Sequence, residues 1–327
     1  MQADLSGFRR ATRVRNSLSV FRFEFLARYL GQPTVTKIAL ATSTKYPQLT
    51  EDDRLLLAPL AAHNIHAEPA IWDDPQFDWT TCAAIVIRSC WDYHLQPEKF
   101  LRWITHFDSA NIPVFNPASL IRWNANKSYL CDLEAKGVPI VPTYWGEDPT
   151  PILLQDKLSE LGWKQAVVKP RISATAYRTQ LVTRDSVDSA QPLFDELRRT
   201  SGVMVQKFME SVSTEGEWSL IFFSGAFSHA ILKKPQPGDF RVQNDFGGTS
   251  QLVDPPPHVL ASATRALPAV HPTVYARVDG VVEGDQFLLM ELELIEPMLF
   301  LADHSQAPNR FAHAISNALA IHRPQAT

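Results

Sequence analysis

The sequence predicts a parallel α/β layer followed by an α+β region. Short apolar runs at 37–42, 83–88 and 113–116 alternate with helical patterns such as the one over 52–60. Strands that alternate with helices pair in parallel. From about residue 124 the strands follow one another more closely, which favours α+β structure. The chain has 327 residues and 45% apolar content, so two or three packed domains are expected.

The elements expected in the second region begin with a helix from Lys127 to Lys136. Gly137 provides a C-cap there, and Pro139 prevents the helix from continuing. Strands are expected at 166–169, 203–206, 218–223 and 226–232. Ser224-Gly225 joins the last two as a tight hairpin. The prolines at 255–257 indicate an exposed connection before a further helix and a final strand pair.

Composition argues against several classes of protein. The net charge is −4 and no basic stripe carries interleaved aromatic residues, so no nucleic-acid partner is expected. Cys82, Cys90 and Cys131 are odd in number and lack a C-x-x-C pairing, which favours reduced thiols in a cytoplasmic setting. No apolar stretch approaches the ~18 residues that span a bilayer. We therefore expect no membrane partner.

The first 36 residues are rich in arginine and poor in acids. This pattern is typical of an organelle transit peptide, but it is also typical of a disordered extension. Nothing downstream indicates an organelle. We therefore expect residues 1–36 to form a poorly ordered basic leader.

Polar and aromatic residues follow the apolar run at 83–88. Ligands collect at the carboxyl ends of strands in open parallel sheets. A substrate crevice is therefore expected at Arg88, Trp91, Asp92 and His94. An aromatic-rich turn is as often a packing feature, and both interpretations stay open.

Glu291 and Glu293 interrupt the strand pattern of a mainly apolar run at 288–297. Side chains alternate along a strand, so Glu291 and Glu293 point to the same side, opposite to Leu292. Two neighbouring carboxylates repel each other unless a cation lies between them, and Mg²⁺ is well suited to this position. The structural alternative is an amphipathic edge strand with a solvated acidic face.

Lys127 and Lys169 are the first two members of an ordered set of motifs. A lysine that ends a buried strand, as Lys169 does, must reach solvent or face an anion. The motifs that follow are Q-K-F-M-E at 206–210, G-E-W-S-L at 216–220, an arginine (Arg241) before a Gly-Gly pair, R-V-D at 277–279 and E-x-E at 291–293.

In this order the motifs resemble the ATP-grasp superfamily, and especially its glutathione synthetase-like and ribosomal-modification-ligase-like branch. The stretch from Val86 to His94, together with 294–297, is similar to the subgroup of the cycloserine-forming cyclo-ligase. The resemblance covers about residues 38–297. It implies an ATP-grasp fold with an N-terminal Rossmann-like (pre-ATP-grasp) α/β domain. The boundaries we expect are a leader at 1–36, the α/β domain at 37–123, and two ATP-grasp lobes at 124–200 and 201–323.

The resemblance also implies roles for the site residues. Lys127 and Lys169 would hold the ATP phosphates, and Arg241 would meet the transferred phosphoryl group or the substrate carboxylate. The further nucleotide contacts would come from Gln206, Lys207, Phe208, Met209, Glu217 and Lys233. Magnesium, as two ions with Mn²⁺ as an alternative, would bind Asp279, Glu291 and Glu293. Glu296 would join the substrate side.

The sequence departs from the family pattern at two places. The loop over the phosphates is often rich in glycine, whereas small and hydroxylated residues occupy 172–176 here. Glu293 replaces the usual asparagine of the metal motif, and its extra negative charge should strengthen metal binding.

These observations predict an ATP- and Mg²⁺-dependent carboxylate–amine ligase that acts through an acyl phosphate. Its partners would be a small amino-acid-like or peptide carboxylate and an amine, and homo-oligomerisation is left open. Phosphoryl transfer needs positioning and charge neutralisation rather than a protein nucleophile, which agrees with the cations and acids of the motifs. Two alternatives are a small-molecule kinase of the same fold and a nucleotide-binding module without activity.

Overall fold

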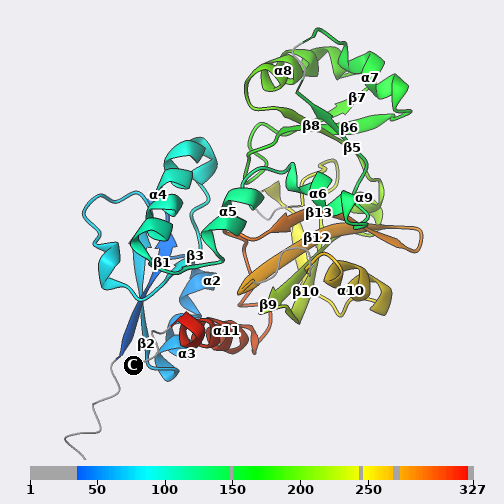
Figure 1. Ribbon diagram of the computed structural model, residues 1–327. Coiled ribbons are helices and arrows are strands. Elements are labelled where there is room, and N and C mark those ends of the chain that lie inside the picture. Colours follow the sequence, from blue (N-terminus) through cyan, green and yellow to red (C-terminus); the bar gives the residue numbers. More distant parts are fainter. Residues whose placement is uncertain (1–34, 148–149, 243–245, 268–272, 323–327) are drawn as a thin grey trace, which may run out of the picture. The chain divides into compact units, whose positions relative to one another are not determined.

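The computed structural model describes residues 35–147, 150–242, 246–267 and 273–322. Their strands form three sheets, one of five strands and two of four (Figure 1). The described residues from Lys37 onward belong to one compact unit. The three cysteines are free, as predicted. No helix in the described ranges is both long enough and apolar enough to cross a membrane.

The first sheet contains the predicted parallel layer. Its strand order is β2 (Ile65–Ile71), β1 (Thr36–Thr42), β3 (Ile85–Ile87) and β4 (Val114–Phe115), and β3 pairs in parallel with both β1 and β4. Strand β2 was not predicted. It carries His66, Glu68 and Pro69, which hide the apolar alternation of a half-buried edge strand.

Four helices accompany this sheet in the described chain: α2 (Glu51–Arg54), α3 (Leu57–Ala62), α4 (Pro97–Ala110) and α5 (Ala118–Asn124). A single helix was expected over 52–60, and two short ones are found. Pro59 is the reason, because its ring lacks an N–H and clashes with the carbonyl four residues earlier. The Thr50 hydroxyl caps α2 by accepting from Asp53 N at 3.1 Å.

The second sheet is antiparallel. Its order is β5 (Thr143–Gly146), β8 (Val203–Lys207), β6 (Gln165–Pro170) and β7 (Gln180–Thr183). Helices α7 (Leu154–Glu160) and α8 (Val187–Thr200) cover one face of it (Figure 1). Because β8 pairs here, the change from one sheet to the next falls after Lys207 rather than at the expected boundary at 200.

The third sheet is also antiparallel and contains β11 (Thr249–Leu252), β10 (Ala226–Lys234), β9 (Glu217–Phe223), β12 (Tyr275–Glu283) and β13 (Gln286–Glu293), in this order. The predicted hairpin is present: Ser224 and Gly225 have φ values of 50° and 77°, as a type I′ turn requires. Helices α6 (Tyr129–Ala135) and α10 (Pro257–Thr264) share an apolar core with this sheet. A single turn, α9 (Ser211–Thr214), precedes β9.

Helix α11 (Ala307–His322) shares one core with the first and third sheets. Phe311 of α11 stacks on Phe223 of β9 with ring centroids 4.9 Å apart. Beside this helix, His229 of β10 is buried, and its two ring nitrogens bond to Ser228 Oγ and Leu299 O at 2.9 and 3.0 Å. Burial lowers the pKa of His229 to about 4.

The depressed pKa of His229 predicts an acid-sensitive stability. The unfolded chain takes up this proton below about pH 6.5, whereas the folded chain resists it until about pH 4, so the contribution of His229 is complete above pH 6.5 and is lost as the pH falls. Between pH 7 and pH 5, the free energy of unfolding of the wild-type chain should fall by about 2 kcal/mol more than that of His229→Gln. The measurement is urea denaturation of both proteins at pH 7 and at pH 5. An equal fall in the free energy of unfolding for the two proteins would contradict this assignment.

Candidate active site

A pocket of about 320 Å³ receives side chains from strands of the second and third sheets and from loops, among them the segments that follow β1 and β3 of the first sheet. Most of the residues proposed from the sequence line it. They are Trp91, Lys127, Lys169, Gln206, Lys207, Phe208, Met209, Glu217, Lys233, Arg241, Asp279, Glu291, Glu293 and Glu296. Arg88, Asp92 and His94 are not among its lining residues.

Strands β12 and β13 provide the acidic side of the pocket. Asp279 lies opposite Glu291 in the register, and Arg277 lies opposite Glu293. These four side chains share one face of the sheet, as the alternation predicted for the two glutamates. A register shift follows Asp279 and places Met290 as an extra residue on β13, so that Met290 also lines the pocket. A strict alternation does not predict this position.

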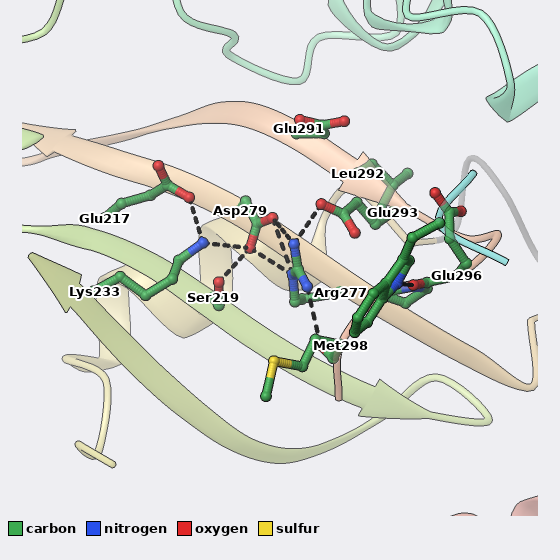
Figure 2. Close-up of polar contacts among 12 residues, drawn as sticks. Glu217, Ser219, Lys233, Arg277, Asp279, Glu291, Leu292, Glu293, Glu296 and Met298 are labelled. Carbon is green, nitrogen blue, oxygen red and sulfur yellow. Dashed lines mark hydrogen bonds and ion pairs between the residues drawn. The ribbon is translucent and has the colours of Figure 1, made fainter. Parts of the chain in front are cut away.

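Arg277 is the centre of the polar network at this face. Its Nε and Nη2 donate to the carboxylate of Asp279 at 2.9 to 3.1 Å, and Nη2 also contacts Glu293. Asp279 accepts from the Ser219 hydroxyl as well, and Lys233 Nζ lies 3.8 Å from it. Figure 2 shows this network, with the carboxylates of Glu291 and Glu296 outside it.

The sequence did not assign a role to Arg277, although its spacing of two from Asp279 places both on one face of a strand. The arginine changes the acidity of its neighbours. Burial opposes ionisation of Asp279, but the charges of Arg277 and Lys233 outweigh it and lower the Asp279 pKa. At Glu293 burial prevails over Arg277, and with the nearby carboxylates it raises the pKa to about 8.

Two lysines face these carboxylates. Lys127 Nζ lies 2.9 Å from Glu291 Oε1 and donates to Ser173 O at 2.7 Å. Lys169 Nζ donates to Gln206 Oε1 at 3.2 Å and forms no ion pair with any carboxylate of the described residues. Burial lowers the pKa of Lys169, because the nearby carboxylates do not fully offset the cost of removing its ammonium from water.

The donor set fits Mg²⁺ bound together with phosphates. Its ligands would be carboxylate oxygens, and a bound cation would oppose the rise in the Glu293 pKa that burial and the neighbouring carboxylates cause. In the ranges that the structure describes, no three His, Cys, Asp or Glu side chains form a group that could hold a metal ion alone. Magnesium is usually held by one or two carboxylates and by substrate phosphates, so a complete protein cage is not required.

The loop after β6 lies over the same pocket. Ala174, Thr175, Ala176 and Thr179 line it, and Thr175 and Ala176 have φ values of 48° and 55°. Left-handed backbone costs roughly 1–2 kcal/mol per non-glycine residue. The loop thus has the small side chains expected from the sequence, but it adopts a conformation that glycine would adopt without this cost.

The end of β8 presents one free backbone donor. The N–H groups of Lys207 and Phe208 donate to Pro142 O and Gln165 O at 2.8 and 3.1 Å. No hydrogen bond within the described chain uses the N–H of Met209, and this residue lines the pocket. The Lys207 ammonium lies 3.7 Å from Glu283 on the hairpin of β12 and β13.

Arg241 is held from one side. Its Nε and Nη2 donate to the carboxylate of Asp239, at 2.7 Å for the shortest contact, and its guanidinium lies 3.7 Å from the centre of the Phe246 ring. Arg241 lowers the pKa of Asp239 far below its usual range. The Nη1 group makes no hydrogen bond to the part of the protein that is described, and it can meet an anion in the pocket.

The prediction that Arg88 lies at the substrate crevice is wrong. This side chain is 1% exposed, and it donates from Nε to Asp53 and from Nη2 to Pro297 O, both at 2.8 Å. Its strand, β3, is an inner strand of the sheet, so the residue that follows it is covered by neighbouring chain. Arg88 is therefore a scaffold residue.

Asp92 and His94 do not line the pocket either. Asp92 accepts a hydrogen bond from Trp72 Nε1 at 2.9 Å, and the His94 ring packs 4.9 Å from the Tyr177 ring. Trp91 does line the pocket, and its Nε1 donates to Glu296 O at 2.8 Å. Of the four residues proposed after β3, one reaches the candidate site.

The fold and this pocket together define an ATP-grasp ligase. A family model described as the N-terminal domain of D-cycloserine synthetase DcsG matches residues 38–116. The cycloserine biosynthesis protein DcsG of Streptomyces lavendulae is 30% identical over 295 residues, which are 86% of this chain and 98% of that protein. The chain belongs to the family of D-cycloserine synthetase DcsG, and it is an ATP-dependent enzyme of the C–N ligase type.

Solved structures agree with this assignment. The crystal structure of D-cycloserine synthetase DcsG has a TM-score of 0.79 at 31% identity, over 86% of this chain and 99% of that one. D-alanine–D-alanine ligase from Bacillus anthracis has a TM-score of 0.65 at 15% identity, over 88% and 98% of the two chains. The ATP-grasp ligase PsnB, complexed with Mg and ADP, has a TM-score of 0.60 at 14% identity, over 88% and 99%. The predicted ATP-grasp fold is confirmed.

The scaffold role of Arg88 predicts a stability defect. Arg88→Met leaves the carboxylate of Asp53 buried without its partner, and the loss of one member of a buried pair costs about 3–5 kcal/mol. The melting temperature should therefore fall steeply. The double variant Arg88→Met/Asp53→Leu should recover much of this loss, because no unpaired charge remains. A single variant that melts as the wild type does would contradict the assignment.

Proposed function

We propose that the chain uses ATP and Mg²⁺ to activate the carboxylate of a small amino-acid-like or peptide substrate as an acyl phosphate, which an amine then attacks. The C–N bond forms as phosphate leaves, and ADP is the other product. The relationship to D-cycloserine synthetase supports this chemistry. The observation that carries the proposal is the partly buried Lys169, a cation that forms no ion pair with a carboxylate of the described residues and that faces carboxylates across the pocket.

Lys169 and Lys127 would bind the phosphates of ATP. Lys169 is the more direct candidate because an anion would supply the charge that the protein does not. Lys127 is already paired with Glu291, so it would exchange part of that contact for a phosphate oxygen. The ammonium of Lys127 also donates to the backbone carbonyl of Ser173, which belongs to the loop that covers the pocket.

The adenine would lie at the end of β8. The unpaired N–H of Met209 can donate to a ring nitrogen, and Gln206 and the backbone of Lys207 and Phe208 would complete this wall. Glu217 would contact the ribose hydroxyls. Lys233 holds Glu217 in place through a contact of 2.5 Å between Nζ and Oε1.

Asp279, Glu291 and Glu293 would hold magnesium, as two ions or with Mn²⁺ as a substitute. The metal supplies charge neutralisation for the phosphates. Arg277 orients two of these acids, so the site is preorganised before the nucleotide arrives.

The acceptor side would use Arg241 and Glu296. The free Nη1 of Arg241 would meet the transferred phosphoryl group or the substrate carboxylate, since Asp239 already holds the other edge of its guanidinium. A ring-closing reaction, in which acid and amine belong to one molecule, is supported by the similarity to D-cycloserine synthetase. The free cysteines support a cytoplasmic setting.

A screen of carboxylate and amine pairs for ADP formation tests the proposed function, with the products analysed by mass spectrometry. We expect a product that has lost one water relative to the acid and the amine. Release of ADP with a stable phosphorylated hydroxyl product would instead indicate a kinase.

Lys169→Met tests the phosphate role. Methionine keeps most of the apolar stem and removes the charge. We expect the Kd for ATP to rise by about tenfold to a hundredfold, as the loss of a charged hydrogen bond predicts, with an unchanged melting temperature. Lys164→Met, at an exposed position just before β6, is the matched control. Unchanged ATP affinity in Lys169→Met would show that this lysine is structural.

Glu291→Gln tests the metal role against the simple ion pair with Lys127. A metal ligand should be needed most at low metal concentration, so turnover should fall at least a hundredfold, with a steeper requirement for Mg²⁺. Glu283→Gln, on the same hairpin and exposed, should behave as the wild type. A loss of activity in Glu291→Gln that is the same at every Mg²⁺ concentration would favour the structural ion pair.

A further inference from the structure

The segment from Leu294 to Met298 has no regular structure, yet each of its carbonyls accepts a side-chain hydrogen bond. The donors, in chain order of the carbonyls, are Asn116 Nδ2, Tyr275 Oη, Trp91 Nε1, Arg88 Nη2 and Arg277 Nη1, at 2.7 to 3.0 Å. The segment also donates from Leu294 N to Asn124 Oδ1 at 3.0 Å. This backbone is therefore fixed, and so is the direction in which Glu296 enters the pocket.

Glu296 is the one acid among the described lining residues without an ion pair. Glu217 is paired with Lys233, Glu291 with Lys127, and both Asp279 and Glu293 with Arg277. The carboxylate of Glu296 lies apart from the network in Figure 2. Burial raises its pKa to about 7, and the charge of Lys127 only partly opposes the rise. A cation is the missing partner.

Tyr93 provides a second polar group that lines the same pocket. Its side chain is 4% exposed and lines the pocket, and its hydroxyl makes no hydrogen bond to any described residue. Burial raises the pKa of Tyr93 well above its usual range, and Glu296 is the acid that adds most to the rise. The hydroxyl thus stays protonated near Glu296, with an oxygen lone pair available to a ligand.

Two further aromatic side chains belong to the same pocket. Trp91 is fixed by its bond to Glu296 O, and Tyr46 packs edge-on against it with ring centroids 5.2 Å apart. Both rings line the pocket. Ring faces attract cations, and the attraction grows when water is excluded.

We propose that Glu296, Tyr93 and Trp91 form a subsite for a protonated primary amine of the organic substrate. This inference rests on the proposed function and specifies the class of its substrate. An ammonium has three N–H donors. Glu296 and Tyr93 accept two of them, and the indole of Trp91 lies against the charge. A neutral hydroxyl would leave the charge of Glu296 uncompensated, and the divalent ions of the proposed function already have Asp279, Glu291 and Glu293 as carboxylate ligands.

The test compares acids that differ only in the α-amine. Purified enzyme with Mg-ATP and hydroxylamine, which traps an acyl phosphate as a hydroxamate, is given each enantiomer of alanine, serine and 2,3-diaminopropionate. The matched acids are propionate, 3-hydroxypropionate and 3-aminopropionate. We expect at least a tenfold higher kcat/KM for hydroxamate formation from an amino acid than from its matched acid. The preference for 2,3-diaminopropionate over 3-aminopropionate assigns the subsite to the α-amine, and the reverse preference overturns that assignment.

Variants connect this preference to the residues. Glu296→Gln should raise the KM for the amino acid tenfold to a hundredfold, and Tyr93→Phe about fivefold, while the Kd for Mg-ATP stays within twofold. The KM for the matched acid should hardly change. Glu98→Gln, on the exposed face of α4, is the control and should retain the wild-type preference.

The outcomes separate the two proposals. Hydroxamate from acids with and without the amine at equal efficiency removes the ammonium subsite and leaves the proposed function. No hydroxamate from any acid removes both. Because the comparison of matched acids uses the wild-type protein, a variant that fails to fold does not prevent the decision.

Discussion

The structure depends on the way in which one irregular segment, 294–298, is held. A buried chain without secondary structure must satisfy its carbonyls elsewhere, and here side chains do so at each position. Arg88, Trp91 and Asn116 donate from the region of the first sheet, and Tyr275 and Arg277 donate from β12. The segment therefore joins these two sheets through hydrogen bonds that are specific in direction. It also sets the position of Glu296 and, through Met298 O, that of the guanidinium at the centre of the acidic face.

The charges of the pocket follow from this arrangement. Most acids and cations are paired with each other, which holds them in fixed positions in a region of low dielectric. Among the described residues that line the pocket, two charged groups form no ion pair: Lys169 on β6 and Glu296 after β13. The pocket can therefore bind one anion at Lys169 and one cation at Glu296. In the proposed function a nucleotide phosphate would pair with Lys169 and a substrate ammonium with Glu296, and their binding would compensate the cost of partly burying both groups.

Much of this could be predicted from the sequence where local pattern decides. The alternation along β13 placed Glu291 and Glu293 on one side, and the ordered motifs placed most lining residues. Arg88 was misassigned because sequence does not distinguish a buried donor to backbone from a ligand to substrate. Its partners Asp53 and Pro297 lie 35 and 209 residues away. Arg277 and Tyr93 were missed for a similar reason, since burial and missing partners are properties of the folded chain alone.

The protonation state of the substrate places a limit on the reaction. An ammonium bound to Glu296 and Tyr93 has no free electron pair, so it cannot attack an acyl phosphate. The subsite would then serve recognition, and the attacking nucleophile must be a different group, either on the same molecule or on a second one. A ring-closing ligase meets this requirement with one substrate that carries a carboxylate, a recognised ammonium and a separate nucleophile. The fixed segment 294–298 would hold the ammonium while the other two groups react near Arg241 and the phosphates.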